Sequence, residues 1–287
     1  MLHLVLSLLS LTPQQSAQLV LREDFDEPGT AWSATLFPDL LLTGNTAFTR
    51  EELSTALGAP STIPPLPINA GGDLEGRFAE VTLGSGSYAL TADTPENRLE
   101  DAALRGYVAI GNPDPFGGQT VGFLLRANIE PHPPFGTGLN AYTAEIVHNG
   151  GQTSASVYLS RWRNGVIRPP DLLASAAFPI DLANENYRIE FRVEGDLLSV
   201  RLWRVTAAGG SVVLAPIPLG TGPGGSANLL TARDSELTAG RAGLSAFARG
   251  GNSVFWDDVE LVQPGDKLGG LGMPPSPPKP AAGALRR

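Results

Sequence analysis

The chain has 287 residues, with 20 Lys and Arg against 29 Asp and Glu, which gives a formal net charge of −9. This acidic balance argues against nucleic acids and anionic membranes as partners, because both select for clustered Lys and Arg. The chain has no cysteine, which excludes disulfides, thiolate metal sites and thiol nucleophiles, and its 34 Gly and 25 Pro favour short strands joined by turns over long helices.

The N-terminus begins with a short apolar run, LHLVLSLLSL, at residues 2–11. Such a run is too short to span a bilayer but suits the core of a signal peptide. We therefore expect residues 1–18 to be a signal peptide, with Ala17 or Gln18 as the last residue removed, and a mature protein that is secreted, periplasmic or extracellular. A buried N-terminal strand or helix is the alternative, because no Lys or Arg precedes the run.

Residues 19–262 alternate between short strand-like segments and turns, without the strand–helix alternation of a parallel sheet. This pattern predicts one all-β domain built as a two-sheet antiparallel sandwich. No repeat of about 20–50 residues is present, which disfavours a propeller or a solenoid. The segments expected as strands are 19–25, 77–83, 88–92, 106–110, 120–128, 141–148, 154–162, 172–178, 187–205 as a hairpin, 212–215, 242–249 and 253–262.

An insertion at about residues 36–74 departs from this pattern. The segment Thr49–Glu52 has the form of a capping box, and Gly58 follows as a stop signal. These signals predict a helix of about two turns. The insertion either covers a groove or decorates one end of the domain.

The strongest local signal is the segment Tyr187–Val205, in which a Gly-Asp turn joins two alternating strands. Folding the chain at this turn pairs Glu190 with Arg201 and Arg188 with Trp203 on one face, as an ion pair and a cation–π pair. The opposite face is then apolar and buried, with the pairs Val193–Leu198, Phe191–Val200 and Ile189–Leu202.

The C-terminal residues 263–287 are rich in Pro and Gly. Pro at this density predicts an extended tail that joins neither a helix nor a strand ladder. The tail is either a spacer or a disordered segment. No other apolar stretch is long enough for a transmembrane segment; we expect export without anchoring, and a monomer.

Four segments recur in this order in one group of proteins: LREDFDEPGTAW at Leu21–Trp32, VGFLLRAN followed by AYTAEIV, the hairpin, and AGLSAFARGGNSVFWDDVELV at Ala242–Val262. They resemble the concanavalin A-like lectin/glucanase superfamily. Within it the chain looks like the bacterial secreted laminin-G-like domains and the 3-keto-disaccharide hydrolase domains. The resemblance implies a jelly roll whose first and last strands are neighbours and whose concave sheet holds glycans.

The resemblance does not carry over a complete catalytic pattern. Family 16 glucanases place alternating acids, E-x-D-x-x-E, on one strand, whereas the corresponding segment here holds Glu145 alone. The 3-keto-disaccharide hydrolases have the pattern Y-E-x-Q-x-x-D on the corresponding strand. When this pattern is aligned on Tyr142, its Glu, Gln and Asp positions are occupied here by Thr143, Glu145 and His148. We therefore expect a binding domain rather than an enzyme. If the chain is an enzyme, we expect a glycosidase-like hydrolase or lyase that uses Glu145 with His148 or Arg126.

The candidate ligand-binding residues are Arg126, Tyr142, Glu145, Tyr158 and Trp162. Arg126 and Glu145 lie on adjacent expected strands, either as a polar floor for sugar hydroxyls or as a structural pair. Tyr158 and Trp162 share one face of a strand, either as a platform that stacks on a sugar ring or as part of the core. Tyr142 is retained from the family pattern.

The candidate metal ligands are Asp24, Asp26, Asp257 and Asp258. If the first and last strands are neighbours, as the resemblance implies, these two acidic pairs approach one another. Like charges at such a junction repel unless a cation bridges them, and carboxylate and carbonyl oxygens suit a structural Ca²⁺. Asp257 and Asp258 point to opposite faces, so at most one of them joins the site. The alternative is a set of solvated charges that protect a sheet edge.

These observations leave three functions open. The first is a secreted, non-catalytic carbohydrate-binding or laminin-G-like surface domain whose partner is a glycan or polysaccharide. The second is a glycoside hydrolase or lyase of the 3-keto-disaccharide hydrolase type. The third is a structural interaction module of the cell envelope.

Overall fold

The computed structural model describes residues 18–23, 39–42, 47–52, 77–91, 93–111, 118–131, 137–149, 153–163, 171–180, 186–208, 211–220 and 228–263. Every strand pair in this part of the chain is antiparallel, and one short 3-10 helix, η3 (Pro95–Asn97), is its one helical element. The strands are β1 (Gln18–Glu23), β2 (Asp39–Leu42), β3 (Ala47–Glu52), β4 (Arg77–Leu90), β5 (Ala102–Gly111), β6 (Gly118–Pro131), β7 (Thr137–Asn149), β8 (Ser154–Trp162), β9 (Asp171–Pro179), β10 (Asn186–Glu194), β11 (Leu197–Ala208), β12 (Ser211–Pro216), β13 (Leu229–Arg233) and β14 (Arg241–Gln263).

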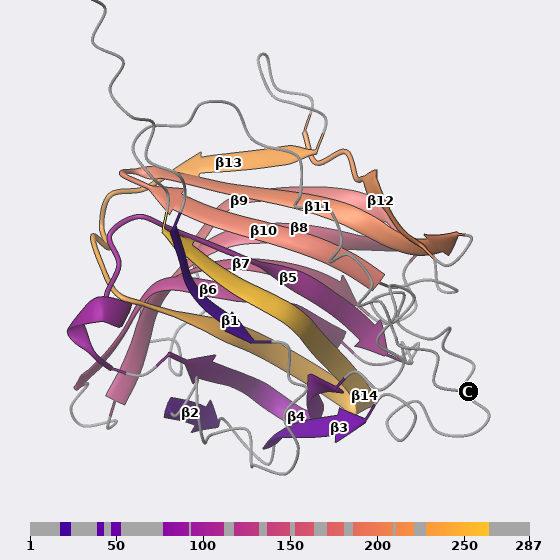
Figure 1. Ribbon diagram of the computed structural model, residues 1–287, viewed down its shortest axis with the longest axis horizontal. Helices are drawn as coiled ribbons and strands as arrows, with labels where there is room; N and C mark the ends of the chain where they lie inside the picture. The colour runs from indigo at the N-terminus through magenta and orange to yellow at the C-terminus, as the bar shows by residue number, and fades with distance from the viewer. Residues whose placement is uncertain are drawn as a thin grey trace, which may run out of the picture.

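The strands form two packed layers (Figure 1). The first, which we call the β7 layer, runs in the order β4, β14, β6, β7, β8 and β9, with β2 on the outer edge of β4. The second, the β10 layer, runs in the order β14, β5, β10, β11 and β12, with β13 also on β11 and β1 on β14. The expectation of a two-sheet antiparallel jelly roll is confirmed.

Strand β14 belongs to both layers. Residues 241–248 pair with β6, and residues 253–262 pair with β5; between them, where Gly250 and Gly251 lie, the pairing of β14 with β4 shifts register from Ala248 to Ser253. Two Gly residues in succession let the backbone bend there, because neither carries a Cβ. β14 therefore closes one side of the sandwich, while contacts between β13 and β9 join the layers at the other side.

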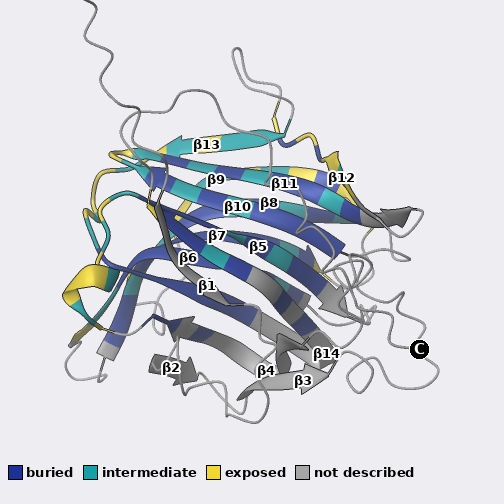
Figure 2. Cartoon of the chain, in the orientation of Figure 1, coloured by how far each residue is buried: buried dark blue, intermediate teal, exposed yellow. Residues whose placement is uncertain are grey.

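The core lies between the two layers, where alternate residues of facing strands meet (Figure 2). Because side chains alternate along a strand, each layer turns one apolar set inward and leaves the other set on its outer face. The largest fully buried side chains of the described residues are Trp256, Tyr142, Tyr187, Phe123, Phe178, Phe191, Leu90 and Leu104. No helix in the described part of the chain is long and apolar enough to cross a membrane.

The hairpin of β10 and β11 has the predicted register. Its three apolar pairs are buried as expected, and Gly195 in the turn has a φ of 55°, a conformation that favours glycine. The predicted cation–π partner was wrong, however. Arg188 lies opposite Trp203 on one side and opposite Tyr107 of β5 on the other, and its guanidinium stacks over the Tyr107 ring, 5.1 Å from the centroid.

The predicted helix in the insertion is not supported at its start. The capping-box residues Thr49–Glu52 belong to strand β3, where Thr49 lies opposite Glu80 of β4 and Glu52 opposite Arg77. A capping box is a local signal, and here backbone pairing with the edge of β4 outweighs it. Residues 53–58 lie outside the described residues.

The two ends of the domain lie side by side. β1 pairs with the last part of β14, with Glu23 opposite Val259 and Gln18 opposite Gln263. The first and last strands are therefore neighbours, as the family resemblance implied. Of the expected signal peptide at residues 1–18 and the expected tail at residues 263–287, only Gln18 and Gln263 are described, and they begin β1 and end β14.

Candidate functional site

A row of residues crosses the outer face of the β7 layer at one level. Tyr88 of β4 lies opposite Ser245 of β14, Ser245 opposite Gly122 of β6, Gly122 opposite Glu145 of β7, and Glu145 opposite Tyr158 of β8. Residues directly opposite each other in a sheet share a face. We call this set the polar row; it lies on the side of the sheet away from the main core.

The outer face of the β7 layer is concave. The Tyr88 ring meets the Trp162 ring of β8 edge to face, with 5.8 Å between centroids and an interplanar angle of 72°. Three strands separate β4 from β8 in the sheet, so a flat sheet would hold them about 19 Å apart. The sheet must therefore roll toward this face to bring the rings together. A small apolar cluster supports them, made of Leu90, Leu124, Ala127, Leu139 and Ala141 with Ile129.

Glu145 is the acidic residue of the polar row, and only 7% of its surface is exposed. Thr143, two residues earlier on the same face, donates a hydrogen bond from Oγ1 to Glu145 Oε2 at 3.3 Å. Burial raises the pKa of Glu145, although the Ser245, Thr143 and Trp162 side chains beside the carboxylate favour its charged form. The pKa of the buried Tyr88 hydroxyl is raised as well, by its own burial and by the charge of Glu145.

Three buried donors around this carboxyl group have no hydrogen-bond partner among the described residues. They are the hydroxyls of Ser245 and Ser160 and the indole N–H of Trp162. Ser245 and Trp162 lie near enough to Glu145 to influence its charge, but neither reaches it with hydrogen-bond geometry. Buried polar groups are normally satisfied. The concave face therefore holds a carboxyl group with one long hydrogen bond, from Thr143, and three donors without a partner among the described residues.

Gly122 lies at the centre of the polar row, where β6 and β7 approach each other closely. A Cβ at this position would lie 2.1 Å from the Ala144 carbonyl oxygen and 2.7 Å from the Glu145 Cα. The Gly122 carbonyl in turn accepts a hydrogen bond from the Trp256 indole at 3.2 Å. The glycine thus permits the close approach of β6 and β7 at the level of Glu145.

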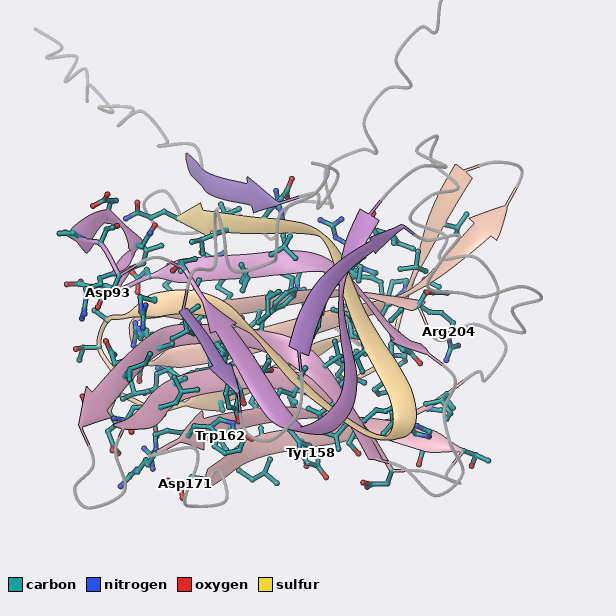
Figure 3. All side chains as sticks on the ribbon, turned by 90° about the horizontal axis from the view of Figure 1, so that it is seen from below. Asp93, Tyr158, Trp162, Asp171 and Arg204 are labelled. Atoms are coloured by element: carbon teal, nitrogen blue, oxygen red, sulfur yellow. The ribbon has the colours of Figure 1, made fainter. Side chains whose placement is uncertain are left out.

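The structure brings three of the candidate ligand-binding residues to one face. Glu145, Tyr158 and Trp162 all lie on the concave face. Tyr158 and Trp162 are both half-buried and lie four positions apart along β8 (Figure 3). The other candidates lie elsewhere. Tyr142 and His148 differ from Glu145 by an odd number of positions along β7, so they point toward the other layer.

Arg126 is held within the chain rather than on the concave face. It occupies an irregularity of β6 with a φ of 51°, and its guanidinium donates to the carbonyl oxygens of Glu100 and Leu237, each at 2.6 Å. Its third nitrogen lies 3.4 Å from Asp101 Oδ1. Neither Arg126 nor His148 converges with Glu145, so the arrangement considered for a hydrolase or lyase is not assembled around that carboxyl.

Tyr142 belongs to a second polar cluster, at the end of the sandwich. Its hydroxyl donates to Asp234 Oδ1 at 2.5 Å and accepts a hydrogen bond from the Leu237 amide at 3.0 Å. Arg161 of β8 pairs with Asp234, with Glu236 at 2.8 Å and with Asp171 of β9 at 2.9 Å. Burial and the bond to Asp234 raise the pKa of Tyr142 to about 12. Burial alone would raise the pKa of Asp234, but Tyr142, the Glu236 amide and Arg161 together lower it. This cluster is satisfied internally and fastens the segment after β13 to the β7 layer.

Of the four candidate calcium ligands, Asp257 and Asp258 are described, and these by their backbone alone. Asp257 lies opposite Tyr107 in the pairing of β14 with β5, and Asp258 lies in the irregularity that follows. The side chains of Asp257 and Asp258, and Asp24 and Asp26 altogether, lie outside the described residues. Within the described part of the chain, no group of three or more His, Asp or Glu side chains gathers as metal ligands do.

Sequence analysis did not single out Tyr88, Ser245, Ser160 or Gly122 as members of this site. Alternation along β8 puts Ser160 on the same face as Tyr158 and Trp162, so Ser160 could have been found in this way. Tyr88 and Ser245 are different, because their position depends on the pairing of β14 with both β4 and β6. No local pattern encodes these registers.

No family model matches the sequence, and no curated protein matches it. Several solved structures are similar in part. A carbohydrate-binding module, CBM66 from Bacillus subtilis, is 16% identical with a TM-score of 0.38, over 64% of this chain and 83% of the module. The CBM2 module of the evolved Dit protein of Lactobacillus casei BL23 phage J-1 is 10% identical with a TM-score of 0.47, over 89% and 99%. A legume lectin-like domain from Entamoeba histolytica is 10% identical with a TM-score of 0.38, over 75% and 88%. At these scores we take no functional argument from the likeness.

Proposed function

We propose that the chain is a non-catalytic carbohydrate-binding domain that holds a sugar against the concave face of the β7 layer. The observation that carries this proposal is the buried Glu145 carboxyl group, surrounded by unsatisfied hydroxyl and indole donors. A site of this kind offers both an acceptor and donors within a small area. Sugars present alternating hydroxyl donors and acceptors, which this set of groups complements.

The aromatic residues support the same proposal. Tyr158 and Trp162 lie half-buried on the concave face, on either side of Ser160 along β8. Aromatic rings stack on the apolar C–H face of a pyranose while the polar groups beside them bond to its hydroxyls. The polar row then sets the orientation of the sugar, and the two rings supply contact area.

The surroundings of Glu145 favour binding over hydrolysis. Glycosidases need two carboxyl groups about 5–9.5 Å apart across the bond that is broken. The described residues beside Glu145 supply hydroxyls, an indole and a phenol, but no second carboxyl group. A single carboxyl of this kind suits recognition.

The proposal extends to the setting of the domain. The apolar run at residues 2–11 supports export, so we place the mature protein outside the cytoplasm as a monomer. The order of the four shared segments supports membership of the concanavalin A-like superfamily, close to the laminin-G-like domains. Calcium bound where β1 meets β14 belongs to the same proposal and is tested separately in the Discussion.

A screen of soluble and insoluble polysaccharides for binding and for turnover tests this function. We expect saturable binding to at least one polysaccharide, without release of reducing sugar. Tyr158→Ala should weaken the binding about tenfold or more, because a stacking contact is lost. Tyr107→Ala is the matched control, since Tyr107 is a half-buried strand tyrosine on the outer face of the β10 layer. Equal losses from the two variants, or turnover of a sugar, would contradict the proposal.

A further inference from the structure

The Glu145 carboxyl group has no positively charged partner among the described residues. The side chains that influence it are the neutral donors Ser245, Thr143 and Trp162. No Arg or Lys side chain that the structure describes pairs with it, although ion pairs are frequent elsewhere in the described residues. A buried carboxylate without a counter-ion is costly. A ligand that brings a positive charge to this place would remove that cost.

The hydrogen bonds of Glu145 lead to the same requirement. An ionised carboxylate accepts up to about four hydrogen bonds, whereas Glu145 accepts one long bond from Thr143, at 3.3 Å. A neutral hydroxyl offers one further donor. An ammonium group offers three donors together with a full charge, and therefore matches the unused capacity of the carboxylate.

The unsatisfied donors set the opposite requirement on the rest of the ligand. The Ser160 and Ser245 hydroxyls and the Trp162 indole N–H need acceptor oxygens, which an ammonium group does not contain. A ligand that satisfies both sets carries an ammonium group and several hydroxyl or ether oxygens on one rigid body. It also presents an apolar face to Tyr158 and Trp162.

From these requirements we propose that the preferred ligand is an amino sugar with a free amino group, whose ammonium pairs with Glu145. This inference rests on the carbohydrate-binding function proposed above and names its ligand class. N-acetylation of the sugar removes the charge and two of the three donors. A uronic acid brings a second negative charge to the buried carboxylate and is repelled.

Titration calorimetry at neutral pH tests this inference on the full chain. The probes are oligomers of glucosamine, N-acetylglucosamine, glucose and glucuronate, with free lysine as an amine that lacks a sugar ring. We expect glucosamine oligomers to bind about tenfold or more tightly than N-acetylglucosamine or glucose oligomers, because a charge-assisted bond replaces a neutral one. We expect glucuronate oligomers and lysine to bind most weakly.

The variant Glu145→Gln removes the charge and keeps the shape. Its affinity for glucosamine oligomers should fall to that for N-acetylglucosamine oligomers. Glu190→Gln is the matched control, because Glu190 is a half-buried strand glutamate on the outer face of the β10 layer. The comparison of probes on the unmodified protein stands even if Glu145→Gln does not fold.

Each remaining outcome separates this inference from the proposed function. Equal affinity for glucose and glucosamine oligomers, or tighter binding of glucuronate, would overturn the amino-sugar assignment and leave carbohydrate binding intact. Binding of lysine as tight as that of glucosamine oligomers would overturn the sugar as the recognised unit. A failure of every sugar to bind, here and in the polysaccharide screen, would overturn both.

Discussion

At the scale of single residues, the concave face depends on one carboxyl group and one missing side chain. Glu145 is buried and accepts one long hydrogen bond, from Thr143, among the described residues, and Gly122 lets β6 and β7 approach closely beside it. A residue that only stabilised the fold would be expected to satisfy its buried polar groups within the chain. Arg126 and Tyr142 behave in that way, since both are bonded to the segment that follows β13.

The raised pKa of Glu145 predicts a dependence of stability on pH. In the folded protein this pKa lies above the ordinary value of 4.5, so the folded state binds more protons than the unfolded state between the two values. The contribution of Glu145 to the free energy of unfolding is therefore fully present below about pH 4.5 and is lost as the pH rises through the folded pKa. Glu145→Gln should remove this decline.

Urea unfolding of the two proteins across this pH range measures the effect. Glu190→Gln serves again as the control and should keep the decline seen in the unmodified protein. The prediction fails if the free energies of unfolding of Glu145→Gln and the unmodified protein run parallel from acid to neutral pH.

Gly122→Ala tests the close approach of β6 and β7. Its Cβ would lie 2.1 Å from a backbone oxygen, so the two strands must separate and the bond from Trp256 to Gly122 is strained. We expect a loss of about 2–4 kcal/mol in the free energy of unfolding, at the upper end of single substitutions. Gly220→Ala is the control, because its Cβ would lie 3.2 Å from the nearest backbone oxygen and needs only a small adjustment. Losses of similar size in both variants would show that the spacing at Gly122 is not tight.

At the scale of elements, the hairpin of β10 and β11 sets the register of the β10 layer. Its turn is local, and its two strands alternate so that one register buries the pairs Val193–Leu198, Phe191–Val200 and Ile189–Leu202. The same register then continues into β5, where Phe191 lies opposite Leu104 and Val193 opposite Ala102. A short local signal thus positions a large part of one layer.

Phe191→Ala should reduce the free energy of unfolding by about 3–5 kcal/mol, because it leaves a cavity between the two layers. Arg192→Ala, one position along, should cost less than about 1 kcal/mol, since Arg192 faces outward and pairs with Glu194 at 3.1 Å. Denaturant titration of both variants decides the matter. A larger loss for Arg192→Ala would mean that the hairpin is out of register by one residue.

The elements differ in how far they can be predicted from sequence, and the reason is the range of the interactions that form them. The hairpin and β8 were predicted closely because turn residues and alternation are local signals. The capping box at Thr49 is also local, yet the segment pairs with β4. The polar row cannot be predicted from such local signals, because Tyr88 and Glu145 are related through three strand pairings, β4 with β14, β14 with β6 and β6 with β7.

At the scale of the whole molecule, the junction of β1 with β14 carries the calcium prediction. If Ca²⁺ binds Asp24, Asp26 and one of Asp257 and Asp258, it joins the two ends of the domain and stabilises the fold by about 2.7 kcal/mol at a hundredfold excess over its dissociation constant. Chelation should then lower the melting temperature by several degrees, and Mg²⁺ should restore it poorly. Asp257→Ala and Asp258→Ala should differ in their effect. If the chelator leaves the melting temperature unchanged, and both variants melt at the same temperature as the unmodified protein, the calcium site is contradicted. These residues would then be ordinary surface charges.

Processing of the N-terminus is the other prediction at this scale. If residues 1–18 form a signal peptide, the mature protein begins near Gln18 or Leu19, at the start of β1. Mass spectrometry of protein from the native host would give the first residue and its compartment. Intact Met1 in the cytosolic fraction would contradict export.

The position of β14 has a consequence for biosynthesis. This 23-residue strand pairs with β1, β4, β5 and β6, and it is the last of the described strands. A ribosome therefore completes the other described strands before the one that unites the two layers emerges. Until then β4, β5 and β6 have edges without their final partner, which are sites for misassociation. Folding must wait for contacts between residues more than a hundred positions apart, so we expect it to be slow and to benefit from chaperones that cover these edges.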